Sequence, residues 1–576
     1  MRFLSLFDQT ASVSCFPLAF SLDRLTYTIL ATGFIVTLPI SAQAASALPD
    51  AGTVLQEVPQ VQPKSEPQKD PTFFNPAEDA QQYSDDSTPI LIRQVEIQGN
   101  TVFTKSTLQA LVAGLENRTS TLGELQRATA QITQYYRQHG YFLARAYLPR
   151  QQLTDGHLNI QILEGNLGQV LLDNQSRVNN QILQRFTAQI PLNQPLQEKT
   201  ANRTLLLISD LAGIAGTQAS LKAGQHTGQT DLALTTLAGK SVQGRIGLDN
   251  YGSSYTGQYR LSGYLQTNSL LGYGEQFSAQ VLASNQDLTS GGINVQLPAN
   301  GQGLMLGAGI SRTDYELGKQ FAILDAKGQS DNYNLNLSYP FIRKQDKNLN
   351  LKALFEYRKL WDEIAATETK TDKHAQVERL QLSYNQRDQW GLSTFKGGFS
   401  QLELTASFGQ LEIESPSALN IDRQSAKTNG HFQKLELSFS RQQVLANQLT
   451  ATAQLYGQLA SKNLDSSEKF SFNQMRAYPS AEGLGDEGWG ATVNIYYQLS
   501  PYLNAYIFKD LGHIYQNKDH YIDEKNRRYL ASTGFGFGGS YQQLDYNASI
   551  AWRDTVAAMS DKDKNPRVLM QAGWRF

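Results

Sequence analysis

The sequence predicts a membrane protein of the all-β class, a C-terminal antiparallel transmembrane β-barrel of sixteen strands preceded by two small α/β domains and a short N-terminal helix. The first observation is that apolar and polar residues alternate in many runs of about ten residues after Val242. The second is composition, since charged residues make up only 18% of the chain while aromatic residues reach 10%. With a targeting segment at the N-terminus, these patterns favour a lipid-facing outside and a wet inside over a soluble β-domain, which also alternates.

Residues 1–44 are predicted to be a secretory signal segment. The apolar run at 28–40 follows Arg24 and precedes an Ala-Gln-Ala cleavage pattern that ends at residue 44. A lone membrane anchor is the alternative, but the run is short for a spanning helix. The only cysteine, Cys15, lies in this segment, so the mature chain is expected to hold neither a disulfide nor a thiolate metal site.

Residues 45–58 are predicted to form a short helix on a tether. Asp50 can cap the helix N-terminus. The predicted apolar face consists of Val54, Leu55 and Val58. Residues 59–89 are rich in Pro, Gln, Ser and Asp without apolar periodicity, which is typical of a linker. A short helix on such a linker suits a detachable element.

Two small α/β domains follow, over residues 90–165 and 166–240. In the first, Thr121 and Glu124 form a capping box before apolar residues at helical spacing. Two strand-like runs then flank a turn at Gly156, so the order is one strand, two helices and two strands. The second domain repeats this order, with helices predicted near 179–189 and 197–211.

Residues 241–576 are predicted to form the barrel. Alternation is clearest in the runs 349–357, 433–441 and 544–552. At about 20 residues for each strand with its loop, the region holds about sixteen strands, an even number as bacterial barrels require. The chain ends on Phe576 with Trp574 on the same face, which resembles the C-terminal assembly signal of outer-membrane proteins.

Few kinds of site chemistry fit this sequence. Basic and acidic residues nearly cancel, 50 against 52, so no nucleic-acid-binding surface is indicated. The seven histidines are scattered, and neither a metal site nor another cofactor is expected. The glycines at 483–490 lack the Lys-Ser/Thr of a phosphate loop. A barrel hydrolase that uses His513 and a nearby serine stays open, because geometry and not sequence identifies such a site.

Nearly the whole mature chain resembles the two-partner secretion transporters of the outer membrane, relatives of the barrel-assembly insertase. The end of the first α/β domain is similar to the family's periplasmic POTRA domain, with "YLP" at 147–149 and "EG" at 164–165. The segment LDNYGSSYTGQYR, residues 248–260, resembles the entry into the first barrel strand. The resemblance implies that the helix at 45–58 is a plug and that both α/β domains are POTRA domains.

The most specific resemblance lies in the loop at 461–489. The family's long sixth extracellular loop folds into the barrel and carries an Arg-Gly-aromatic motif near its tip. Here that motif reads Arg476-Ala477-Tyr478. Ala477 departs from the family glycine, which puts the local backbone in question because alanine tolerates positive φ poorly.

A second motif supplies the expected partner of this loop. The family's Phe-x-Asp-x-Gly strand is represented here by Phe508, Asp510 and Gly512. The resemblance implies that Arg476 pairs with Asp510 and fixes the loop tip to the barrel wall, as an arginine fork matches a carboxylate in bidentate geometry. A solvated loop arginine is the alternative.

The resemblance implies an outer-membrane transporter, not an enzyme, that recognises an unfolded exoprotein in the periplasm and passes it through the barrel without nucleotide hydrolysis. Adhesins, haemolysins and contact-dependent growth-inhibition toxins are the clients of such transporters, and the sequence does not choose among them. Other expected partners are outer-membrane lipid and, during biogenesis, the barrel-assembly machinery; the chain is expected to be monomeric and to bind no nucleic acid. The alternatives are a factor that inserts other barrels and a barrel enzyme.

Overall fold

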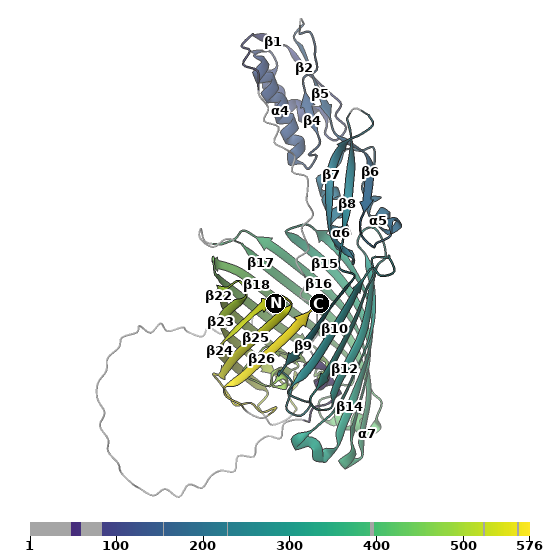
Figure 1. Cartoon of the computed structure of the whole chain (residues 1–576), viewed down its shortest axis with the longest axis vertical. Helices are drawn as coiled ribbons and strands as arrows, with labels where there is room; N and C mark the ends of the chain where they lie inside the picture. Colours follow the sequence, from purple (N-terminus) through teal and green to yellow (C-terminus); the bar gives the residue numbers. More distant parts are fainter. Residues whose placement is uncertain are drawn as a thin grey trace, which may run out of the picture. The chain divides into compact units, whose positions relative to one another are not determined.

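The computed structural model describes residues 48–58, 83–153, 155–226, 228–391, 397–521, 525–561 and 564–576. The predicted signal segment at 1–44 and residues 59–82 of the predicted linker lie outside these ranges. Across the described ranges, no helix combines the length and the apolar character needed to span a membrane. The described chain forms a short helix, two α/β domains and a closed β-barrel (Figure 1).

The first α/β domain packs two helices on a three-stranded sheet. Its elements are β1 (Ile90–Ile92), β2 (Gln94–Gln98), α3 (Lys105–Val112), the 3-10 turn η1 (Ala113–Leu115), β3 (Arg118–Ser120), α4 (Leu122–Gln138), β4 (Arg145–Tyr147) and β5 (His157–Leu163). The predicted capping box starts α4, because Thr121 and Glu124 each accept a backbone N–H from the other. β2 pairs in parallel with β5, which pairs antiparallel with β4. Beyond the predicted order, β1 and β3 form a separate two-stranded sheet.

The Glu-Gly pair at the end of this domain holds its last strand to the turn after β2. Glu164 is buried and accepts hydrogen bonds from the backbone N–H groups of Thr101 and Val102 at 2.7 and 2.9 Å. It also accepts one from the Tyr136 hydroxyl at 2.7 Å, and burial together with this bond raises the pKa of Tyr136. Gly165 has a φ of +73°, and a Cβ there would lie 2.4 Å from a neighbouring side chain, so glycine is required.

The second α/β domain has the predicted order of one strand, two helices and two strands. Its elements are β6 (Asn166–Asn174), α5 (Asn180–Thr187), α6 (Glu198–Ser209), β7 (Ile214–Ala223) and β8 (Gln229–Ala238). β8 is the central strand, parallel to β6 and antiparallel to β7. Apolar residues of both helices, among them Leu183, Phe186 and Leu205, form one core with this sheet.

Sixteen antiparallel strands form the closed barrel, as the alternation predicts. They are β9 (Val242–Asp249), β10 (Arg260–Asn268), β11 (Gln276–Ser284), β12 (Leu288–Pro298), β13 (Met305–Glu316), β14 (Ala326–Arg343), β15 (Lys347–Ile364), β16 (Thr369–Asp388), β17 (Gly398–Ile413), β18 (Gly430–Ala446), β19 (Leu449–Ala460), β22 (Glu487–Ser500), β23 (Leu503–Tyr515), β24 (Arg527–Tyr541), β25 (Leu544–Arg553) and β26 (Arg567–Arg575). One helix, α7 (Pro416–Gln424), and two 3-10 turns, η2 (Lys319–Leu324) and η3 (Ala365–Thr367), lie in the connections.

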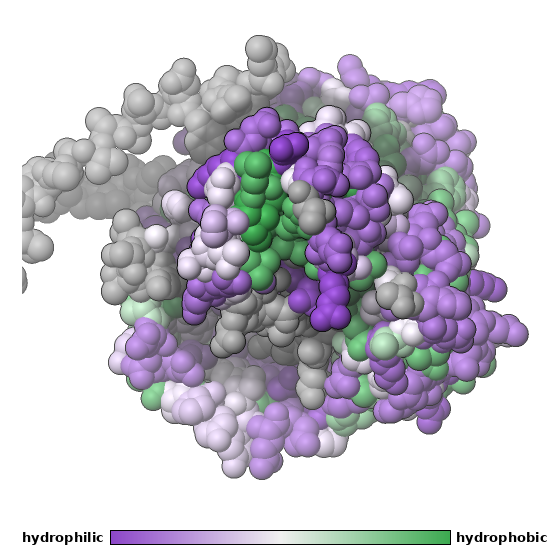
Figure 2. Space-filling model, turned by 90° about the horizontal axis from the view of Figure 1, so that it is seen from above, coloured by the Kyte–Doolittle hydropathy of each residue, from purple (hydrophilic) through white to green (hydrophobic). Residues whose placement is uncertain are grey.

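Side chains alternate between the two faces of the barrel wall. Along β23, Ile507 is 59% exposed while its neighbour Phe508 is 3% exposed. The exposed face is apolar on many strands, as at Leu261, Val281, Ile293, Ile310 and Leu335. By contrast, the face of the molecule in Figure 2 is mostly hydrophilic, with a narrow hydrophobic strip. The apolar exposed face is what a lipid-facing wall requires.

The strand pairings differ greatly in length. β15 and β16 pair along the whole of β15, whereas β26 and β9 pair only through 571–575 and 245–249. The segment 248–260 is not the entry into the first strand, so this expectation was wrong. β9 already begins at Val242, and 248–260 contains its end and the connection to β10.

Candidate functional site

The long loop between β19 and β22 lies against the inner wall of the barrel. β22 begins at Glu487, so the loop spans 461–486 and the last three residues of the predicted range belong to the strand. The loop contains the 3-10 turns η4 (Ser466–Glu468) and η5 (Ser480–Gly483) and the paired strands β20 (Phe470–Ser471) and β21 (Leu484–Gly485). Its apolar side chains form one cluster with residues of β23, β24 and β25: Phe470, Phe472, Met475, Ala477, Tyr478, Tyr506, Phe508, Ile514, Leu530 and Ala551.

Arg476 in this loop forms a forked ion pair with Asp510 of β23. Its Nε and Nη2 donate to Asp510 Oδ2 and Oδ1 at 3.0 and 2.5 Å, and its backbone N–H donates to Oδ2 at 3.2 Å. Ser532 of β24 donates to the same carboxylate at 2.8 Å, and Arg476 Nη1 donates to Asn494 Oδ1 of β22 at 2.9 Å. Asp510 is fully buried, so its charge depends on these donors for compensation.

The Phe-x-Asp-x-Gly motif supplies three successive inward positions of β23. Phe508, Asp510 and Gly512 are all buried, while the residues between them are more exposed. The Arg476 guanidinium carbon lies 3.4 Å from the centroid of the Phe508 ring, a cation–π contact. A Cβ at Gly512 would lie 3.2 Å from the Phe472 ring, so the glycine leaves room for the loop. The structure thus brings these motif residues together.

Ala477 and Tyr478 are also buried in the loop cluster. The Tyr478 hydroxyl donates to the Val556 carbonyl at 2.9 Å and lies 2.9 Å from Thr555 Oγ1. The Tyr478 carbonyl accepts a hydrogen bond from Arg567 of β26. Ala477 does not have positive φ, and its methyl group packs in the cluster. The departure from the family glycine therefore does not strain the loop.

A buried carboxylate that the sequence did not single out provides a second attachment. Glu468 is 1% exposed and lies 3.0 Å from Arg358 Nη1, 3.0 Å from Lys434 Nζ and 3.1 Å from Arg379 Nη2. Burial opposes ionisation, but the three cations lower the pKa of Glu468 well below its ordinary range. These cations stand on β15, β18 and β16, so the loop contacts the wall opposite the Arg476 motif as well as the wall beside it.

Two further loop carboxylates are buried beside cations. Asp486 pairs with Lys469 at 2.9 Å. Glu482 pairs with Arg528 and accepts the backbone N–H of Ser560 at 2.8 Å. The sequence marks these contacts only by acidic residues in a polar loop, and their partners follow only from the strand register.

The predicted plug helix, α2 (Ala51–Glu57), lies in the barrel lumen beside the loop. Asp50 caps it, as predicted. The Asp50 carboxylate also accepts hydrogen bonds from Lys373 Nζ of β16 at 3.0 Å and from Ser466 Oγ of the loop at 2.6 Å. The Ala51 N–H donates to Asp362 Oδ1 of β15 at 2.8 Å. The N-terminal end of the helix is therefore held by polar groups of both the loop and the wall.

The C-terminal end of α2 has a similar set of contacts. Arg260 Nη1 of β10 donates to the Glu57 carbonyl at 3.0 Å. Gln56 Nε2 donates to the carbonyls of Ser466 and Lys469 at 2.7 and 3.0 Å. Between the two ends, Gly52 allows a close approach, since a Cβ there would lie 2.3 Å from Ser466 Oγ.

The buried face of α2 differs from the predicted one. Val54 is fully buried among inward-facing residues of the wall, whereas Leu55 is half-buried. Val58 lies beyond the last helical residue in an extended conformation, so its place on the helix was predicted wrongly. Ala51 and Glu57 complete the buried face instead, and a carboxylate occupies the position expected for an apolar side chain.

The C-terminal aromatic residues face away from the lumen. Trp574 and Phe576 are 51% and 47% exposed, and their ring centroids are 5.7 Å apart. Phe576 extends the closing pair of strands, because its backbone N–H and carbonyl both bond to Gly244 at 3.1 Å. This is the placement expected of aromatic side chains on a lipid-facing strand.

The histidine considered for hydrolysis has no serine at its level on the neighbouring strands. His513 of β23 pairs in register with Trp489 and Tyr529, and its ring centroid lies 4.8 Å from that of Tyr515. Among the residues that the structure describes, no group of three or more His, Cys, Asp or Glu side chains is arranged to hold a metal ion.

Two family models match the chain. The POTRA domain of ShlB type matches residues 90–165, and the haemolysin secretion/activation protein ShlB/FhaC/HecB matches residues 228–539, more than half of the chain. The heme/hemopexin transporter protein HuxB of Haemophilus influenzae (strain 86-028NP) is 26% identical over 92% of this chain and 95% of its own length. The outer membrane transporter CdiB of Dickeya dadantii (strain 3937) is 23% identical over 82% of this chain and 84% of its own.

Solved structures agree with this assignment at the level of the fold. CdiB from Escherichia coli superposes with a TM-score of 0.67 and 18% identity over 85% of this chain and 91% of its own. CdiB from Acinetobacter baumannii gives a TM-score of 0.62 and 16% identity over 88% and 94%. With its sixteen-stranded barrel and its POTRA domain, the chain belongs to the haemolysin secretion/activation protein ShlB/FhaC/HecB family, the two-partner secretion transporters of the outer membrane.

Proposed function

We propose that this chain exports an unfolded exoprotein through its barrel, and that α2 and the loop at 461–486 together close the lumen at rest. The observation that carries the proposal is that both segments lie against the inner wall and bind each other through Ser466. The sequence has no phosphate-loop motif, so the driving force is expected to come from folding of the client outside the cell.

The contacts of α2 support its role as the segment that leaves. The helix has only seven residues, and its polar contacts at the two ends are hydrogen bonds and a single ion pair, that of Asp50 with Lys373. Water can replace such bonds when the helix moves, so the net free energy of docking is modest. The loop is the more permanent part, and Arg476 with Asp510 is proposed to fix its tip to the wall during transport.

The client is proposed to be a large secreted exoprotein. Adhesin, haemolysin and contact-dependent growth-inhibition toxin remain the candidate classes, and the relative named for heme/hemopexin adds an exoprotein of that kind. The α/β domains are expected to hold the unfolded client in the periplasm by strand addition at a sheet edge. The available edges are β2 or β4 in the first sheet and β6 or β7 in the second.

Conductance and secretion test this proposal together. A variant that lacks residues 48–58 is expected to show large, frequent openings in a planar bilayer, while the full chain stays mostly closed. A matched control replaces the surface turn η3 with glycines and should behave like the full chain. Co-expression with a large exoprotein of one of these candidate classes should place that exoprotein in the medium. Equal conductance of the deletion variant and the full chain would contradict the plug, and absence of secretion would contradict export.

We also propose that the chain is a monomer in outer-membrane lipid and that the barrel-assembly machinery recognises Trp574 and Phe576. Their exposure on the outward face of the last strand supports this role. Replacing both with alanine should reduce the amount of heat-modifiable barrel in the outer membrane. A factor that inserts other barrels is the alternative function, and depletion of the chain would then lower the levels of unrelated outer-membrane barrels.

A further inference from the structure

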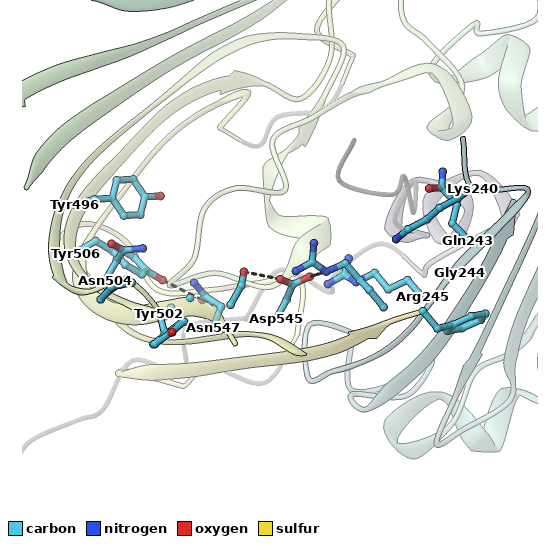
Figure 3. Close-up of a pocket in the computed structure, with 16 residues that line it drawn as sticks. Lys240, Gln243, Gly244, Arg245, Tyr496, Tyr502, Asn504, Tyr506, Asp545 and Asn547 are labelled. Carbon is cyan, nitrogen blue, oxygen red and sulfur yellow. Dashed lines mark hydrogen bonds and ion pairs between the residues drawn. The ribbon is translucent and has the colours of Figure 1, made fainter. Parts of the chain in front are cut away.

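A polar cavity of about 480 Å³ lies at one end of the barrel, beside the strands that close it. The start of β9 and the end of β26 form one side, and the ends of β22 to β25 form the other (Figure 3). Lys240, which precedes β9, also lines the cavity, so this is the end where the chain enters the barrel from the second α/β domain.

Two arginines face each other across the closing strands in this cavity. Arg245 of β9 and Arg575 of β26 are register partners. Both lie on the lumen face, because their neighbours Ile246 and Trp574 are exposed on the outside. Like charges directly opposite each other destabilise an antiparallel pair. The arrangement therefore disfavours closure of the barrel unless something else compensates it.

The described chain compensates this charge only in part. Arg575 pairs with Asp545 at 3.0 Å, and Asp545 also accepts a hydrogen bond from Ser540 at 2.6 Å (Figure 3). In the part of the chain that the structure describes, Arg245 has no ion pair with a carboxylate, and its Nε is buried without a hydrogen bond. Among the described side chains that line the cavity, Asp545 is the one carboxylate beside the two arginines.

The uncharged residues that line the cavity suit a polypeptide ligand. Tyr506 and Asn547 stand on the same inner wall, joined by a hydrogen bond of 3.0 Å from the tyrosine hydroxyl to the amide oxygen (Figure 3). Hydroxyl and amide groups of this kind can bond to backbone groups of a passing chain without reading its sequence. A lipid reaches the outer face of these strands, whereas this cavity opens on the inner one.

We propose that this cavity is a subsite for the exported polypeptide, in which Arg245 and Arg575 bind an acidic side chain of an extended segment as it enters the barrel. The inference rests on the proposed export function. A carboxylate between the two guanidinium groups offsets their repulsion and accepts charge-assisted hydrogen bonds from Arg245, which has no carboxylate of its own. A single ion pair of this kind that water can reach is weak, so the segment can move on.

Fluorescence anisotropy on the full chain in nanodiscs tests this subsite. The probe is a labelled unstructured peptide of alternating Glu and Asn, and its neutral counterpart has Gln in place of Glu. Arg245→Gln is expected to weaken binding of the acidic peptide about fivefold, because a single ion pair that water can reach contributes little. The double variant, Arg245→Gln with Arg575→Gln, should weaken binding further. Arg245→Lys should retain most of the affinity. Lys352→Gln is the matched control, because Lys352 lies on the inward-facing side of the distant strand β15.

Thermal unfolding separates this role from a structural one. Arg245→Gln should leave the melting temperature unchanged or raise it, because it removes a like-charge contact. A loss of stability that parallels the loss of peptide binding would overturn the proposal. Equal effects of Lys352→Gln, or equal binding of acidic and neutral peptides, would also overturn it.

The remaining outcomes distinguish this inference from its alternatives. If the arginine variants change retention of phosphatidylglycerol in the nanodisc but leave peptide binding intact, the cavity is a lipid site and the proposal fails. If the wild-type chain secretes its exoprotein but Arg245→Gln does not change the affinity for the peptide, this inference alone fails. If the wild-type chain neither secretes nor binds either peptide, the proposed export function fails with it.

Discussion

Helix α2 and the loop at 461–486 occupy the same lumen but are attached to it in different ways. The loop has a large apolar cluster and four buried carboxylate contacts, and its attachments reach both sides of the barrel. The helix has seven residues, buries only Ala51 and Val54 in an apolar cluster, and is otherwise held at its ends by hydrogen bonds and one ion pair between Asp50 and Lys373. Burying charges and rings together makes an attachment costly to break, whereas hydrogen bonds at a helix end exchange readily with water. We therefore expect the loop to remain bound to the barrel wall during transport and the helix to leave the lumen.

The largest expected effect is on the loop. Asp510→Asn leaves the Arg476 guanidinium without its carboxylate, and removal of one partner from a buried pair costs about 3–5 kcal/mol. Urea unfolding of the barrel, followed by its heat-modifiable migration, measures this loss. Asp554→Asn is the matched control, because Asp554 pairs with the exposed Lys509 of the same strand and surface pairs contribute about 1 kcal/mol or less. Equal losses of stability in the two variants would show that the buried loop pair contributes no more than a surface ion pair.

A somewhat smaller loss is expected at the second attachment. Glu468→Gln removes the charge that three cations share, and about 2–3 kcal/mol of loop attachment should be lost because Arg476 still holds the tip. Limited proteolysis should then cut the loop faster than in the wild-type chain. Glu412→Gln serves as the control, since Glu412 is exposed beside His374. Unchanged cleavage in Glu468→Gln would mean that the apolar cluster alone holds the loop.

Displacement of the helix is expected to leave the barrel intact. In Gly52→Ala the new methyl group would meet Ser466 Oγ at 2.3 Å and the Ser467 backbone nitrogen at 2.5 Å. Overpacking of this kind costs about 2 kcal/mol, or about thirtyfold in the docking equilibrium. Channel openings should become frequent while urea unfolding does not change. Gly114→Ala is the control, because a Cβ there meets nothing within 4 Å. A fall in barrel stability in Gly52→Ala would contradict a detachable helix.

The smallest expected effect is a pH dependence of docking. Burial raises the pKa of Glu57 from 4.5 to about 7, against the opposing charge of Arg260 and with a smaller contribution from Asp561. The docked helix therefore binds a proton more tightly than the released helix, so docking is favoured as the pH falls from 7 towards 4.5 and penalised above 7. Arg567 also faces this group.

The frequency of channel openings should accordingly fall about twentyfold between pH 7.5 and 5.5, which corresponds to about 1.8 kcal/mol. Bilayer recordings at the two pH values measure the change. Glu57→Gln should reduce the dependence, because it keeps the shape and removes the titration of this group. Channel openings that become more frequent on acidification would contradict the prediction that protonation of Glu57 favours docking.

Much of the fold follows from the sequence because strand alternation is local. Leu435, Leu437 and Phe439 already distinguish the two faces of one strand without any partner, and repetition of such runs leads to the number of strands. The sheet of β1 and β3 was not predicted, because each strand has only three residues and too few positions to show a period. The error at 248–260 arose because β9 is short and glycine-containing, so its alternation is weak.

The site could be predicted only where a motif marked it. Arg476 and Asp510 stand in two recognisable patterns, and resemblance to the family paired them. Glu468 has partners on three strands that are distant in sequence, so only the register brings them together. Val58 was misplaced because the last apolar residue of a periodic run need not be helical, and here the helix ends one residue earlier.

The short pairing between β26 and β9 governs how the barrel forms. These two strands lie at opposite ends of the barrel sequence. Their pairing therefore joins residues that are farther apart in the sequence than in any other strand pair of the barrel, and it has the largest entropy cost of loop closure. We expect it to form last, and slowly. Until it forms, β9 has an unpaired edge that invites pairing with other chains. The aromatic residue at the very end of the chain is thus the one whose arrival ends the aggregation-prone stage of folding.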